Sequence, residues 1–167
     1  MKKRNYLWSC LLGGITIAAE GTAIYYLIRA LKNRINFADR YAAYYSLLNQ
    51  VLENKKEQVD MSKYFQDHAI KKIAIYGRGS LGNLFYDEIK DKNCDIVCFI
   101  DKNAGNTYFD GDDKIPVVGI NEKDIIQQAE IIVVTPVFDY DEISEDLFNK
   151  GIHGDMISLE DVVYYNE

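Results

Sequence analysis

Residues 73–82 hold the pattern in this chain most suited to ligand chemistry. A short apolar run ends in GRGSLG at positions 77–82, which has the spacing G-x-G-x-x-G. In that spacing the first glycine permits a tight turn, the second lets a pyrophosphate approach bare backbone, and the third lets a helix pack close to the preceding strand. A phosphate there would meet N–H groups at the positive end of a helix dipole.

The elements that must position this turn are a strand before it and a helix after it. Residues 81–89 place apolar side chains on one helical face, and residues 95–100 form a second β-type run that Asp101 closes. At this distance from the glycines an acidic residue of a Rossmann unit holds a ribose hydroxyl. Asp101 could instead cap the next turn, and both interpretations stay open.

The rest of the chain continues this alternation of strands and helices. We expect a parallel sheet of about five strands with right-handed crossovers, which is an α/β, Rossmann-like fold. Pro116 cannot donate to a ladder, so its strand is expected at the sheet edge. The turn, Asp101 and Thr135-Pro136 should then surround one crevice. The remaining expected elements are a polar loop over 102–114, strands over 115–118, 131–135 and 156–158, and helices over 122–128, 140–149 and 159–164.

The first 35 residues look like a membrane anchor. A mostly apolar run from Tyr6 to Ile28 is long enough to cross a bilayer and has basic residues on both sides. A cleaved signal peptide is one alternative, and a peripheral amphipathic helix, suggested by Glu20, is another. Nucleotide ligands are cytoplasmic, so we expect a single-pass membrane protein whose domain faces the cytoplasm.

Residues 36–70 are expected to form an amphipathic helix over 38–54 and a linker, followed by the nucleotide-binding domain over 71–167. The tyrosine-rich stripe of that helix is typical of packing surface, although tyrosines can also stack on bases. Small residues at helical spacing around Glu20, namely Gly13, Thr16 and Ala23, would let two anchors approach closely. A homo-oligomer is therefore possible.

Charge and cysteine usage narrow the classes of partner. The chain up to Lys72 has 12 Lys and Arg against 6 Asp and Glu, and the remainder has 7 against 20. An acidic domain repels phosphate backbones, which argues against nucleic acid as a partner. Cys10, Cys94 and Cys98 show no metal-like spacing and suit a reducing compartment, with Cys94 expected to be the accessible thiol.

Candidates for catalysis and metal binding are poor. Tyr86 and Lys90 have the spacing of a dehydrogenase pair, but they lie in the first helix after the glycine turn, away from the reacting end of a cofactor. His68 and His153 have no obvious acid or nucleophile partner. We predict no catalytic residue and no metal site.

From about Tyr41 onward the chain resembles the Rossmann-like domains of bacterial capsule and glycan-biosynthesis proteins. Such domains are appended to glycosyltransferases and precede sugar acyltransferases and nucleotide-sugar dehydratases. The resemblance lies in residues 73–82, 98–103, 115–118 and 131–140. It implies that a nucleotide or nucleotide-sugar contacts Gly77, Gly79, Ser80, Gly82 and Asp101, to which we add Arg78, Leu81 and Thr135 as candidates.

The chain lacks the acyltransferase repeat domain, the dehydratase catalytic domain and any glycosyltransferase part. We therefore expect a membrane-anchored protein that binds NAD(P) or a nucleotide-sugar and is accessory to cell-surface polysaccharide synthesis, with a glycan-biosynthesis protein as a possible partner. One alternative is an oxidoreductase or epimerase completed by a partner chain. Another is a non-catalytic interaction module with an empty crevice.

Overall fold

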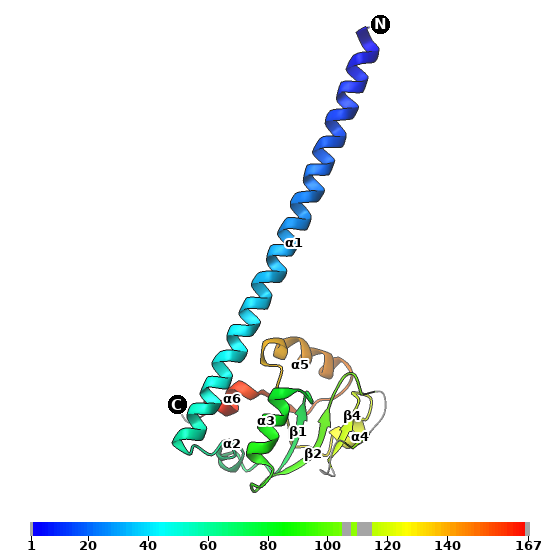
Figure 1. The fold of residues 1–167 in the computed structure, drawn as a ribbon. Helices are drawn as coiled ribbons and strands as arrows, with labels where there is room; N and C mark the ends of the chain where they lie inside the picture. Colours follow the sequence, from blue (N-terminus) through cyan, green and yellow to red (C-terminus); the bar gives the residue numbers. More distant parts are fainter. Residues whose placement is uncertain (1, 105–107, 110–114, 166–167) are drawn as a thin grey trace. The chain divides into compact units, whose positions relative to one another are not determined.

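A computed structural model shows the fold (Figure 1). It describes residues 2–104, 108–109 and 115–165, without the side chains of residues 2–21, 23, 33 and 108–109. The chain divides into two compact units, residues 1–42 and 43–167. Both the predicted anchor and the predicted amphipathic helix fall within one helix, α1 (Lys2–Glu57).

No helix among the described residues is long and apolar enough to cross a membrane. The predicted span from Tyr6 to Ile28 stays a prediction. Most of it, residues 6–21 and 23, lies outside the residues whose side chains are described. Its helical backbone is the part of the prediction that the structure does show.

Six strands of the described chain form one sheet in the order β3-β4-β2-β1-β5-β6. The five strands other than β3 pair in parallel, as the sequence predicts. The chain runs outward from β1 through β2 to β4, then returns to the other side of β1 for β5 and β6. This order is that of a Rossmann-like fold, and its direction reverses between β1 and β5. The strands are β1 (Lys72–Tyr76), β2 (Asp95–Ile100), β3 (Tyr108–Phe109), β4 (Pro116–Val118), β5 (Ile131–Val134) and β6 (Asp155–Ser158).

The prediction that the Pro116 strand lies at the sheet edge is wrong. β3 pairs antiparallel with β4 and covers it, with Phe109 opposite Pro116. Pro116 is tolerated because it opens its strand, one of the few positions where a missing N–H can be accommodated. β3 lies within the segment that the sequence predicts as a polar loop.

Helices pack against both faces of the sheet. One apolar cluster joins α1 to α2 (Lys63–Asp67), α3 (Ser80–Ile89) and α6 (Leu159–Val163). The other lies under α4 (Lys123–Ile126) and α5 (Tyr140–Asn149), which follows the short 3-10 helix η1 (Val137–Asp139). All of β5 is buried, as expected for an inner parallel strand.

A buried amide fixes the last turns of α1 to the end of the domain. Asn54 is 6% exposed, and its Nδ2 donates to the carbonyl of Val163 at 2.8 Å. Leu47 and Val51, on the same side of α1, belong to the apolar core. Residues 43–57 therefore pack as part of the compact unit 43–167.

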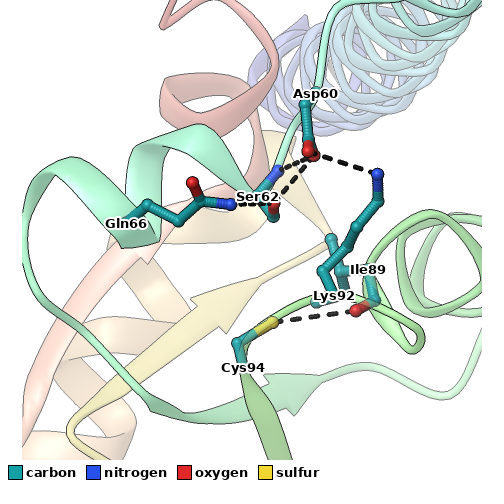
Figure 2. Close-up of polar contacts among 6 residues, drawn as sticks. All are labelled: Asp60, Ser62, Gln66, Ile89, Lys92 and Cys94. Atoms are coloured by element: carbon teal, nitrogen blue, oxygen red, sulfur yellow. Dashed lines mark hydrogen bonds and ion pairs between the residues drawn. The ribbon is translucent and has the colours of Figure 1, made fainter.

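Asp60 organises the connection that leads from α1 to α2 (Figure 2). Its Oδ1 accepts from the backbone N–H and hydroxyl of Ser62 at 2.9 and 2.8 Å, and its Oδ2 accepts from Lys92 at 3.2 Å. Burial alone would raise the pKa of Asp60, but these donors outweigh burial and hold the pKa below its ordinary value.

Cys94 is not the accessible thiol that the sequence suggests. It is 8% exposed, and its Sγ donates to the carbonyl of Ile89 at 3.7 Å (Figure 2). Cys98 is fully buried in β2, and burial raises its pKa to about 12. Both thiols are therefore protonated and unreactive at neutral pH. Cys10 lies outside the described side chains.

Candidate functional site

The glycine turn connects the carboxyl end of β1 to α3. Gly77 adopts φ +100°, and its N–H donates to the carbonyl of Ile100 at 2.8 Å. A Cβ there would lie 2.8 Å from Thr135 Oγ1, so both backbone conformation and space require glycine at this position.

The other two glycines have opposite surroundings. A Cβ on Gly82 would lie only 2.0 Å from the carbonyl oxygen of Gly77, so α3 packs directly against the turn. Gly79 has extended backbone before the first turn of α3, and a Cβ there would meet nothing within 4 Å. The space above Gly79 is where a ligand could approach the backbone.

A cavity of about 370 Å³ opens at this point of the sheet. That volume is within the range of roughly 300–1,000 Å³ typical of small-molecule sites. The cavity lies between the ends of β1 and β5, where the strand order reverses, and it is contained within the compact unit 43–167. Its lining residues are Tyr44, Leu48, Gly77, Gly79, Ser80, Leu81, Thr135 and Pro136.

The start of α3 gives this cavity its polar character. The first N–H groups of an α-helix have no intrahelical acceptor and carry the positive end of the helix dipole. The first turn of α3 contains no acidic residue, and the carbonyl of Gly79 accepts from Asn83 N at 2.9 Å to close that turn. An anionic group bound beside Gly79 and Ser80 would therefore be stabilised.

Thr135 holds the two central strands together at the cavity wall. It is 3% exposed, and its hydroxyl donates to the carbonyl of Tyr76 at 2.9 Å. Its backbone N–H donates to the same carbonyl at 3.0 Å. Thr135 therefore shapes the wall of the cavity, and its hydroxyl proton is already engaged within the protein.

Arg78 and Gly82 are not part of the cavity lining. The Arg78 guanidinium carbon lies 4.1 Å from the centre of the Phe99 ring, so the side chain is held over β2. Gly82 is buried beneath the turn. The structure gives Gly82 the packing role that the motif predicts for its third glycine, and it places the Arg78 side chain on an aromatic ring.

Asp101 lies at the end of β2 but is also absent from the lining. Its Oδ1 accepts from the backbone N–H of Asn103 at 2.8 Å, and its carbonyl accepts from Ala104. The side chain therefore caps the turn after β2, which is the second of the two interpretations left open by the sequence. The other carboxylate oxygen, Oδ2, accepts none of the hydrogen bonds described for Asp101 and is the better placed to accept from a ribose hydroxyl.

Two lining residues, Tyr44 and Leu48, were not predicted at the crevice. They come from α1, which lies far from the glycine turn in the sequence, whereas Pro136 follows Thr135 as expected. The tyrosine-rich face of α1 could have indicated that Tyr44 lines the cavity, but from the sequence alone we interpret that face as packing surface.

The lining that the structure describes offers hydroxyl groups but no carboxylate, imidazole or thiol. Within the described residues there is also no cluster of three or more side chains able to hold a metal ion. The site, as described, has the features of a binding site for an anionic or neutral ligand.

Comparisons with known proteins identify no family. No family model matches the chain, and no curated protein matches it. A solved structure of UDP-D-quinovosamine 4-dehydrogenase from Vibrio fischeri is similar with a TM-score of 0.44 and 20% sequence identity. The match covers 56% of this chain and 84% of that chain.

The two glycines of contrasting surroundings give a direct test of this geometry. Gly82→Ala forces α3 away from the Gly77 carbonyl, and we expect a loss of about 2 kcal/mol or more in the free energy of unfolding, as for other overpacked sites. The methyl group of Gly79→Ala would lie in open space, so this variant should change the free energy of unfolding by less than about 1 kcal/mol. Urea denaturation of both variants measures the difference, and equal losses would contradict the described turn.

Proposed function

We propose that this protein binds NAD(P) or a nucleotide-sugar in the cavity beside the glycine turn. The observation that carries the proposal is the open space above Gly79, which adjoins the cavity between β1 and β5. A pyrophosphate there would reach the N-terminal N–H groups of α3, while Tyr44 and Leu48 would contact an apolar part of the ligand.

We further propose that binding occurs without independent catalysis. The described cavity lining lacks a side chain that commonly serves as a general base near neutral pH. An oxidoreductase or epimerase would have to obtain such a group from another chain. The accessory role in bacterial cell-surface polysaccharide synthesis rests on the sequence resemblance to glycan-biosynthesis domains.

Ligand binding can be measured by isothermal titration calorimetry of the full chain with NAD, NADP, a UDP-sugar and coenzyme A. We expect binding of a nicotinamide dinucleotide or the UDP-sugar, and its loss in Gly79→Val, whose side chain fills the approach to the backbone. Gly154→Val is the matched control, because a Cβ at Gly154 also meets nothing within 4 Å and Gly154 is not among the residues lining this cavity.

Thermal midpoints near that of the wild type would show that both valine variants fold. Absence of binding to every ligand in a folded sample, or binding unaffected by Gly79→Val, would contradict the proposal. The first of these outcomes would favour an interaction module.

The variant Asp101→Asn tests whether Asp101 contacts a ligand in addition to capping the turn after β2. The amide oxygen can still accept from Asn103, so the fold and thermal midpoint should be retained. If the other oxygen of Asp101 holds a ribose hydroxyl, its replacement by an NH₂ group should weaken binding by about tenfold, equivalent to roughly 1.4 kcal/mol. Unchanged affinity in the same titration would show that Asp101 caps the turn after β2 but does not contact the ligand.

We propose that the segment from Tyr6 to Ile28 anchors the protein in the bacterial inner membrane with the domain in the cytoplasm. The apolar length and basic flanks of the sequence support this. Alkaline carbonate extraction of membranes should leave the full chain in the pellet and release a variant lacking residues 1–35. Release of the full chain would favour the peripheral helix.

A further inference from the structure

Helix α1 carries nearly all of the large apolar side chains that the described residues leave exposed; the exceptions are Phe138 and Phe148. Leu31 and Ile35, for example, are 52% and 58% exposed. Exposed apolar residues on this scale mark an interaction surface rather than ordinary surface composition. The question is which partner the pattern fits.

Six of the twelve large apolar residues that α1 leaves exposed occupy the a and d positions of a heptad repeat, and three more occupy the neighbouring g positions. With Ile28 at position a, the a positions continue every seven residues and the d positions fall three residues later. Every described a and d residue from Ile24 to Leu52 is exposed. The a positions are Ile28, Ile35, Ala42 and Asn49, and the d positions are Ile24, Leu31, Ala38, Tyr45 and Leu52.

The domain occupies a different side of α1 in this register. Ser46, Leu48 and Lys55 contact the domain of unit 43–167 from e and g positions. The more buried contacts with it are those of Tyr44, Leu47, Val51 and Asn54. These are c and f positions, which lie opposite the a and d side of a helix with this repeat. Tyr45, Asn49 and Leu52 therefore remain exposed where α1 packs on its own domain.

The identities at these positions fit a second copy of the same helix. Isoleucine at a and leucine at d favour two parallel strands, and one asparagine at an a position fixes register. Arg34 is at g and Asp39 at the following e position, and both are exposed. In a parallel pair, Arg34 of each chain would meet Asp39 of the other, whereas residues five apart on one helix do not face each other.

We propose that the protein forms a parallel homodimer through the a and d residues of α1, from Ile24 to Leu52. This inference does not depend on nucleotide binding. Within unit 43–167 the buried contacts of Leu47, Val51 and Asn54 come from c and f positions, so dimerisation through a and d positions does not compete with them.

Cysteine crosslinking of the full chain tests the register directly. In a Cys10→Ser background, Leu31→Cys at d and Ile35→Cys at a should form disulfide-linked dimers on oxidation with copper phenanthroline, because equivalent a and d residues of two parallel helices approach closely enough for a disulfide. Asn36→Cys and Phe37→Cys, at the exposed b and c positions, are the matched controls and should not. Cys94 and Cys98 are buried and remain in place.

No crosslinking at Leu31 and Ile35 would overturn the proposal, and would be expected if this face lies on lipid or binds a different protein. Equal crosslinking at all four positions would overturn it as well, because it indicates nonspecific association. Crosslinking only between two different positions in mixed samples would indicate antiparallel helices and contradict the parallel register.

Changing the charges at positions 34 and 39 provides a second test. The dissociation constant of the dimer is measured by sedimentation equilibrium, with all variants in the same detergent. Arg34→Glu places two like-charged pairs in the parallel dimer and should raise its dissociation constant by about tenfold. Adding Asp39→Arg restores opposite charges and should recover the wild-type value. A double variant as weak as the single one would contradict the proposed pairing.

Discussion

The close approach of α3 to the end of β1 is the constraint on which the rest of the site depends. The missing Cβ of Gly82 lets the helix lie against the Gly77 carbonyl, where any side chain atom would be only 2.0 Å away. This contact aims the helix N-terminus at the carboxyl end of the sheet. The left-handed turn at Gly77 and the open space above Gly79 follow from the same short connection. The shape of this cavity therefore depends on backbone geometry more than on any single side chain.

Elements with strong local signals could be predicted from sequence. The apolar runs of β1, β2 and β5 and the helix α5 were found because each has its own periodicity and boundaries. β3 was missed because two residues in a polar segment have no period, and its pairing with β4 is decided by tertiary contact. The wrong prediction that β4 lies at the sheet edge followed from missing β3. Pro116 has no backbone N–H to donate, but it is the first residue of β4, so the rest of the strand can still pair on both sides.

Side-chain roles at the site were harder to predict than the fold. The motif places the backbone of Gly77, Gly79, Ser80 and Leu81 at the cavity, because that geometry is encoded locally. Arg78 and Asp101 are instead held by Phe99 and by the turn after β2, which are contacts that spacing does not reveal. Tyr44 and Leu48 reach the cavity through the packing of α1, and Cys94 is buried in the apolar cluster that also contains Leu47 and Val51 of α1.

The amide of Asn54 has a consequence for the order in which the protein is made. Its acceptor, the Val163 carbonyl, lies 109 residues later in the chain. Contacts of such high sequence separation form late and slow folding. The end of α1 is synthesised early, but the hydrogen bond from Asn54 to Val163 can form only after α6 has left the ribosome. Until then, the apolar side of residues 43–57 lacks part of the surface on which it packs. An incomplete chain with exposed apolar surface is prone to associate with other chains.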